Sequence, residues 1–266
     1  MSRDTDPHDS SSAGDSAGVP WEGRRFESNP HSHDDGSADP SLLAALTAFR
    51  VGRADQVAVI EAYRTARLLI PLVAEKGDGT DEAAEQIGGH GLPIDKTQEL
   101  SIVTVAAPDG RRVLPVFTSV ASMSRWDAAA RPVPADGVRT AVAASADDTD
   151  LIVIDPGSDT EFVLRRPAVW ALAQSLPWEP SFASPEVFAG LHESVGGELA
   201  ILDLAVEPGD PDARLRGPEL VVRLDLIHGL DQSELDAVLA RLAKRWAADH
   251  RIAVLVDSLT VKLVRA

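Results

Sequence analysis

The spacing of apolar residues along the chain predicts a series of helices and strands. Residues 42–49 carry leucines and a phenylalanine at helical spacing, and either Asp39 or Ser41 is expected to cap this helix. A second helix is predicted over residues 56–67, and it leads directly into a short buried strand at residues 68–74. The first folded segment is therefore expected to be a helix pair followed by a strand.

Short apolar runs separated by turn signals continue this pattern to about residue 175. Pro108-Asp109-Gly110 and Asp155-Pro156-Gly157 each separate two such runs, which is typical of β-hairpins. The predicted elements are strands at 100–107 and 112–116, helices at 119–129 and 134–145, strands at 150–154 and 161–164, and a helix at 167–175.

The last part of the chain shows a strand–strand–helix–strand–strand pattern. Asp231 and Glu234 form a capping-box sequence at the start of the helix predicted over residues 231–250. A sheet covered by one helix would leave its other face either solvated or available to a partner. The strands are predicted at residues 198–206, 219–227, 252–257 and 260–265.

Together these elements predict the fold class and the domain organisation. The expected fold is α+β, with two small mixed sheet and helix domains after a disordered acidic N-terminal arm, the second domain being ββαββ. The predicted boundaries are an arm at residues 1–38, an N-terminal domain at 39–175, a linker at 176–197 and a C-terminal domain at 198–266.

The arm contains two aromatic residues in a polar background. Residues 1–19 are too polar to fold alone, but Trp21 and Phe26 follow them closely. Because burial of aromatic rings is favourable, we expect these two residues to dock onto the N-terminal domain. The alternative is that they are isolated aromatics in a disordered segment.

Composition and charge narrow the classes of partner. The chain has 266 residues and a formal net charge of −17, so phosphate backbones and anionic lipid surfaces should repel it. We therefore expect neither nucleic acid nor membrane as a partner. No apolar run approaches the length of about 20 residues that a membrane span needs, and no secretory leader pattern opens the chain. These features predict a cytoplasmic protein.

The chain has no cysteine. Disulfides, thiolate zinc sites, iron–sulfur clusters and a cysteine nucleophile are excluded by that composition. The histidines offer one imaginable metal site, in which His31 and His33 lie beside Asp34 and Asp35. Ordering this Gly- and Ser-rich segment around a metal would cost much conformational entropy, so we expect no metal and no cofactor.

Four sequence stretches resemble one known family when they are taken in order. They are IPLVAE at 70–75, LPVFTSVASMSRW at 114–126, VRTAVAA at 138–144 and LIVIDPGSDTEFVL at 151–164. Over roughly residues 40–175 the chain resembles the SseB family N-terminal domain. The upstream PWEGR and DDGSADPSLLAAL look like the actinobacterial form of the family, and the final domain is similar to the family's C-terminal domain in outline.

The resemblance implies a modest amount about function. The family is named for an enhanced serine-sensitivity phenotype in enteric bacteria, and it has no agreed enzymatic activity, cofactor or catalytic residue set. The resemblance therefore implies an interaction or regulatory protein with an unknown protein partner. It does not indicate an oligomeric state.

Phe117-Thr118-Ser119 raises the possibility of a nucleophilic serine, because an apolar strand ends there and a helical pattern begins. The nucleophile elbow of α/β-hydrolases needs glycines on both sides of the serine, whereas the flanking residues here are Phe117 and Ala121. No histidine follows within the same predicted domain. Thr118 and Ser119 are residue types preferred at a helix start, so we interpret Ser119 as a cap. Trp126 ends the same stretch and is a candidate structural or interaction residue.

Three further residues are candidates for binding or for structure. Asp155 could present a carboxylate to a ligand, but Asp-Pro-Gly is also a turn sequence, and we favour the turn. Arg165 and Arg166 could pair with an anionic partner, but we favour two solvated charges before a helix.

Three hypotheses for the function follow. We favour a non-enzymatic protein-interaction or regulatory protein. The second hypothesis is a small-ligand sensing module, with an amino acid as the ligand, and it rests on analogy with the serine phenotype. The third is a serine hydrolase that acts through Ser119.

Overall fold

The computed structural model describes residues 34–74, 100–102, 104–107, 110–146, 149 and 151–265. Residues Gly36–Ala266 form one compact unit, which holds two large hydrophobic cores and two smaller clusters among the described residues. We call residues 36–178 the N-terminal half and residues 179–265 the C-terminal half. Helices and sheets occur in both, so the predicted α+β class is confirmed. Trp21, Phe26, His31 and His33 lie outside the described residues.

Two capped helices open the N-terminal half. They are α1 (Pro40–Arg50) and α2 (Gln56–Thr65). The Asp39 carboxylate accepts hydrogen bonds from the backbone N–H groups of Ser41 and Leu42, so Asp39 is the cap of α1. The leucines whose spacing predicts α1 also anchor the helix, because Leu42 and Leu46 are fully buried in the core.

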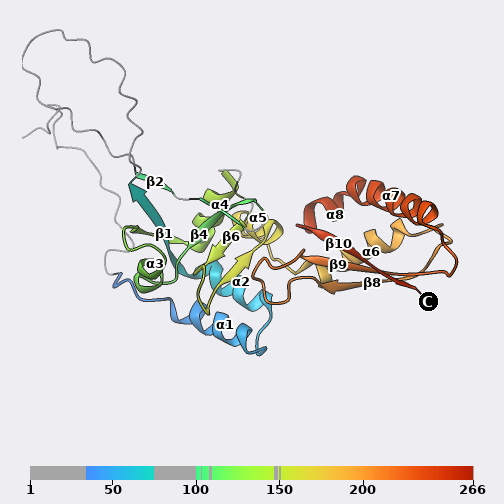
Figure 1. Cartoon of the computed structure of the whole chain (residues 1–266). Coiled ribbons are helices and arrows are strands. Elements are labelled where there is room, and N and C mark those ends of the chain that lie inside the picture. Colours follow the sequence, from blue (N-terminus) through green and yellow to red (C-terminus); the bar gives the residue numbers. More distant parts are fainter. Residues whose placement is uncertain are drawn as a thin grey trace, which may run out of the picture. The chain divides into compact units, whose positions relative to one another are not determined.

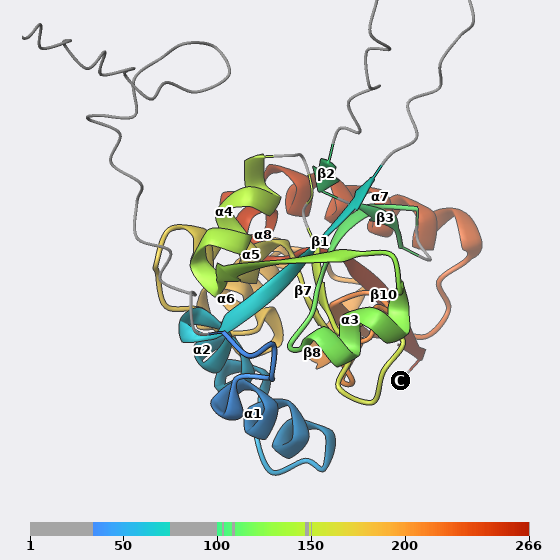
Figure 2. The ribbon, with the colours of Figure 1, turned by 90° about the vertical axis from the view of Figure 1, so that its left-hand side faces the viewer.

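Two small sheets form the centre of the N-terminal half. The first has the strand order β2-β1-β5 and is antiparallel; the second has the order β3-β4-β6-β7, with only β4 and β6 parallel. Figure 2 shows β1 running between the helices α3 (Val120–Trp126) and α4 (Gly137–Ala146). The bounds are β1 (Arg67–Ala74), β2 (Leu100–Ile102), β3 (Val105–Ala106), β4 (Arg112–Val116), β5 (Arg131–Asp136), β6 (Leu151–Ile154) and β7 (Phe162–Leu164), with α3 (Val120–Trp126), α4 (Gly137–Ala146) and α5 (Arg166–Ala173).

Residues 131–136 depart from the prediction, because the helix expected from residue 134 begins only at Gly137. The strand β5 forms instead and pairs with β1, placing Pro132 opposite Pro71 and Pro134 opposite Leu69. Because β5 lies at the edge of its sheet, prolines that cannot donate a ladder hydrogen bond are tolerated there.

The C-terminal half is a three-stranded sheet with helices on one face. Its elements are β8 (Ile201–Pro208), β9 (Leu220–Leu226), α7 (Gln232–Ala248), α8 (His250–Leu255) and β10 (Leu259–Arg265). The capping box of Asp231 and Glu234 is present at the start of α7. In Figure 1, α7 and α8 lie on the same side of the sheet β10-β9-β8.

The strand predicted at residues 252–257 is wrong, and the ββαββ outline is corrected to ββααβ. Asp249 caps a further helix here by accepting from the backbone N–H of Arg251 at 2.8 Å. β10 pairs with β9 in parallel, so the chain must cross over the sheet before it returns. The helices α7 and α8 make that crossover, and Ile252 is buried in the core.

The predicted linker at residues 176–197 also contains regular structure. A short 3-10 helix, η1 (Ser181–Ala183), precedes the helix α6 (Pro185–Ser194). Pro185 occupies the first turn of α6, where a missing N–H costs nothing. Val187 and Leu191 are fully buried in the C-terminal core. Residues 179–197 are therefore part of the C-terminal half rather than a free linker.

The face of the C-terminal sheet opposite the helices is charged. Arg223 lies 3.9 Å from Asp203 and 3.4 Å from Asp225, and Lys262 lies 3.7 Å from Glu207. Exposed pairs of this kind contribute little stability, but they compensate one another's charge. This face is therefore a poor candidate for an apolar contact with a partner.

Candidate functional site

Ser119 occupies the cap position that its sequence context favours. Its Oγ accepts a hydrogen bond from the backbone N–H of Ser122 at 3.1 Å, at the start of α3. The two serine hydroxyls are also 3.0 Å apart. A hollow of about 750 Å³ adjoins Ser119, and its lining, as far as the structure describes the chain, includes no histidine. The serine hydroxyl is thus engaged in its own helix.

Asp155 is a turn residue whose carboxylate is fully used inside the protein. Its side chain is 1% exposed, and its backbone φ of 45° lies in the left-handed region. One carboxylate oxygen accepts from the Thr118 backbone N–H at 2.9 Å. The other accepts from the hydroxyls of Thr118 at 2.7 Å and Thr160 at 2.9 Å. Asp155 therefore fastens the β6–β7 turn to the start of α3.

Phe117 and Trp126 belong to a small satellite core beneath α3. Their ring centroids lie 5.2 Å apart, and Phe117 is fully buried. Leu69 and Met123 complete the buried part of this cluster. Both aromatic residues therefore hold α3 against β1.

The sequence interpretation of Arg165 as a solvated charge is wrong. Its side chain is 8% exposed and reaches the C-terminal half, where it lies 2.7 Å from Asp210 and 3.0 Å from Asp257. It also donates to the Gly217 carbonyl and the Ser258 hydroxyl. Sequence reasoning missed this role because the two carboxylates lie far along the chain.

The carboxylate of Asp257 is stabilised in its charged form at this junction. Burial would raise the pKa of Asp257, but hydrogen bonds and positive charge from Arg111 and Arg165 outweigh burial, so the pKa lies below its ordinary value. The junction is therefore a compensated buried ion network, and it offers no free charge to an outside ligand.

The interpretation as a solvated charge is also wrong for Arg166, which is partly buried and contacts the C-terminal half in a different way. Its guanidinium donates to the backbone carbonyls of Ala253 and Val256, at the end of α8, at 3.1 and 2.8 Å. The same guanidinium lies 5.1 Å from the ring centroid of Trp170. A cation over an aromatic face is attracted to it, so Arg166 helps to fix this tryptophan.

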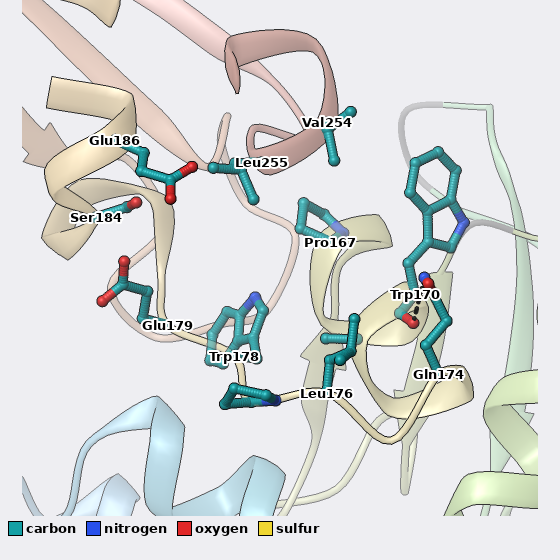
Figure 3. A pocket seen from close by; sticks show the side chains of 12 residues that line it. Pro167, Trp170, Gln174, Leu176, Trp178, Glu179, Ser184, Glu186, Val254 and Leu255 are labelled. Carbon is teal, nitrogen blue, oxygen red and sulfur yellow. Dashed lines mark hydrogen bonds between the residues drawn. The ribbon is translucent and has the colours of Figure 1, made fainter. Parts of the chain in front are cut away.

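A groove that sequence reasoning did not predict lies beside Trp170. It has a volume of about 420 Å³ and is lined from α5, from the segment that follows it, from the start of α6 and from α8. We call it the Trp178 groove and define it by Trp170, Leu176, Pro177, Trp178, Val254 and Leu255. Figure 3 shows these elements arranged around an open centre.

The residues of the Trp178 groove are apolar but not enclosed. Trp178 packs partly against the N-terminal core, and Leu255 packs partly against the C-terminal core. Leu176 is 50% exposed. Indole and aliphatic side chains held by two cores therefore present a preformed apolar surface.

The indole N–H of Trp178 has no hydrogen-bond partner and is shielded from solvent. The indole of Trp246 provides the contrast, since its N–H donates to the Ser194 hydroxyl at 2.7 Å. In Figure 3 the nitrogen of Trp178 lies on the ring edge toward the other groove residues, but because it is shielded from solvent it does not open into the groove as drawn. Buried donors are usually paired, so this one marks a place where a hydrogen bond is missing.

Two carboxylates lie on the same side of the groove. Glu179 follows Trp178 directly, and Glu186 lies in the first turn of α6, a position that suits a negative charge. Both are exposed, and neither forms an ion pair with any residue that the structure describes. The groove thus combines an apolar floor with uncompensated negative charge.

The sequence did hold a signal for this groove. Pro177-Trp178-Glu179-Pro180 places a tryptophan between prolines in a stretch read as linker. An aromatic residue gains nothing in a free linker, which is the same argument that singled out Trp21. The remaining groove residues come from elements that are far apart in the chain, so the sequence alone could not predict that they lie together.

Metal and membrane sites receive no support within the described ranges. No cluster of three or more His, Asp or Glu side chains there could hold a metal ion. Nor does any described helix have the length and apolar character needed to cross a bilayer.

Comparison with known proteins gives one match. Residues 42–171 match the model of the SseB protein N-terminal domain. No curated protein and no solved structure is significantly similar to the chain. The matched range includes Ser119, Asp155 and Arg165, and it ends before Trp178.

Proposed function

The chain belongs to the SseB family through the N-terminal domain at residues 42–171, and on that premise we propose that it is a non-enzymatic protein-interaction or regulatory protein. We assign the contact with its protein partner to the Trp178 groove. The observation that carries this assignment is a pair of partly exposed tryptophans, Trp170 and Trp178, in one apolar depression. Tryptophans in such positions are the usual anchors of protein interfaces.

The non-enzymatic character is supported by the hydrogen bonds that Ser119 and Asp155 form within the protein. Ser119 caps α3, and both oxygens of Asp155 accept hydrogen bonds from threonines. A nucleophile needs a base within reach, and a binding carboxylate needs a free oxygen. Side chains whose polar atoms already form hydrogen bonds within the protein are poor candidates for a nucleophile or for a ligand-binding carboxylate.

A small-ligand sensing role has less support than a protein partner. The hollow beside Ser119 is lined by hydroxyls, but these pair with one another or with Asp155, as Ser158 does with Thr160 at 3.0 Å. A ligand would have to displace those internal bonds. The Trp178 groove requires no such exchange, because its donor is unpaired.

The proposed partner is a protein and not a nucleic acid or a membrane. The formal net charge of −17 opposes association with polyanionic surfaces. The groove adds its own negative charge through Glu179 and Glu186. We propose that this association takes place in the cytoplasm.

Photo-crosslinking tests the proposed function. A photoreactive phenylalanine analogue is placed at Leu176 inside the groove or, as the control, at Leu199, which is 91% exposed outside it. In cells that make the protein, we expect a discrete protein adduct from position 176 and none from position 199. Equal adduct patterns at both positions, or none at either, would contradict the assignment.

A further inference from the structure

We propose that the groove binds an extended, proline-containing peptide segment of the partner that carries an arginine or lysine beside its apolar residues. This inference rests on the proposed function and names the chemistry of the partner. It follows from the charge at the groove, from its unpaired donor and from its aromatic lining.

Charge complementarity argues for the basic residue. Glu179 and Glu186 lie on one side of the groove and have no cationic partner within the described residues. Some exposed carboxylates elsewhere are compensated by a cation of the chain itself, as Glu193 is by Arg251 at 2.7 Å, whereas Glu179 and Glu186 flank an apolar depression without such a cation in the described part of the chain. A guanidinium or ammonium group of the partner would supply the missing charge, and the pairing would be sensitive to salt.

The unpaired indole N–H argues for an extended backbone. The Trp178 donor needs an acceptor, and a peptide carbonyl can provide one only if its own helix or sheet does not use it. A polyproline II segment has no internal hydrogen bonds and leaves its carbonyls free. Because the donor is shielded from solvent, a small rotation of the indole must accompany binding.

The lining of the groove argues for proline or aliphatic side chains in that segment. Trp170, Leu176 and Trp178 present flat and aliphatic surfaces in one depression. Aromatic-lined grooves recognise proline-rich segments because such segments are already extended and lose little entropy on binding. The carboxylates of Glu179 and Glu186 in the same lining would repel an acidic ligand.

Fluorescence anisotropy tests this inference on the full chain. The probe is the labelled peptide Pro-Pro-Leu-Pro-Pro-Arg-Arg, and two comparison probes carry glutamates for the arginines or glycines for the prolines. We expect saturable binding of the first probe that weakens as salt increases. We expect at least roughly fivefold weaker binding of each comparison probe.

Matched variants locate the binding. Glu179→Gln with Glu186→Gln should weaken binding by roughly fivefold and reduce its salt dependence. Trp178→Phe keeps an aromatic ring but removes the N–H, and it should weaken binding by a similar factor while the protein stays folded, as a cooperative thermal melt would show. The control pair Asp203→Asn with Glu207→Gln removes two charges from the outer face of the sheet and should bind as the unaltered protein does.

The outcomes separate this inference from the proposed function. Adducts at position 176 without binding of the proline–arginine probe would overturn the peptide class and leave the protein-interaction function standing. Absence of both would overturn both. Equal binding of the glutamate probe, or equal losses in the control pair, would also reject the peptide class. Self-association of the protein that Trp178→Phe abolishes would show a second copy of the chain as the occupant instead.

Discussion

The Asp155 turn and the Trp178 groove differ in how their polar groups are satisfied. At the turn, each carboxylate oxygen of Asp155 accepts from a donor of the same chain. At the groove, the Trp178 N–H and the carboxylates of Glu179 and Glu186 have no such partners among the described residues. Internal pairing indicates a structural role, whereas unpaired groups around an apolar surface indicate contact with another molecule.

Arg165 resembles Asp155 in this respect, because its polar atoms also have hydrogen-bond partners within the chain. Its guanidinium uses four acceptors, which come from two carboxylates, a hydroxyl and a carbonyl. The network is buried and compensated, and it links the two halves. The comparison therefore predicts large stability losses at Arg165, smaller losses at Asp155 and Ser119, and almost none in the groove.

Removal of the Arg165 guanidinium should have the largest effect on stability. Arg165→Met keeps much of the side-chain volume but leaves Asp210 and Asp257 as buried carboxylates without this partner. Breaking a buried ion network from one side costs about 3–5 kcal/mol of unfolding free energy. Urea unfolding measures this loss, and Arg125→Met at an exposed position of α3 is the control. A loss of unfolding free energy no larger than that of the control would show that the ion pairs of Arg165 do not stabilise the fold.

Loss of the Asp155 carboxylate should have the next largest effect. Asp155→Ala leaves the buried Thr118 N–H without an acceptor and places alanine at a φ of 45°. Together these changes should cost about 2–4 kcal/mol in urea unfolding. Asp155→Asn retains one acceptor oxygen and tolerates the left-handed backbone, so it should cost clearly less. Equal losses in the two variants would show that the hydrogen bonds do not hold the turn.

The sequence predicted local features of this comparison better than distant ones. The cap at Ser119, the turn at Asp155 and the capping box at Asp231 each depend on a few neighbouring residues, and each is present. The pairing of Arg165 with Asp210 and Asp257 joins residues that are distant in the chain, so no local pattern contains it.

The errors in secondary structure have the same origin. Residues 252–257 are apolar enough for a strand, and only the parallel pairing of β9 with β10 requires the helical crossover. Residues 176–197 have the prolines and glycines of a linker, but Val187 and Leu191 are drawn into the C-terminal core. Tertiary packing thus decided between two structures that the local sequence allowed.

The Ser119 cap should show a modest effect that distinguishes structure from catalysis. Ser119→Ala removes the acceptor for the Ser122 N–H and should cost about 1 kcal/mol in urea unfolding. Ser119→Asn restores a capping oxygen and should recover most of that loss. A fluorophosphonate probe that labels the unaltered protein but not Ser119→Asn would instead make Ser119 a nucleophile.

Substitution of a groove residue should have the smallest effect on stability. This test decides whether the exposed apolar surface of the groove contributes to the stability of the fold. Leu176 is 50% exposed, so Leu176→Ser removes little buried area and should change the unfolding free energy by no more than about 0.5 kcal/mol. Leu172 lies on the same stretch of chain but is fully buried, and Leu172→Ala should cost about 2–5 kcal/mol. The two variants therefore separate a leucine that the fold needs from one that the fold leaves exposed. For the crosslinking test, the photoreactive residue is placed at Pro177 instead of Leu176. The adduct from this position should disappear in Leu176→Ser even though the protein remains folded. If Leu176→Ser unfolds as readily as Leu172→Ala, the groove wall is part of the core, and the contrast with the Asp155 turn fails.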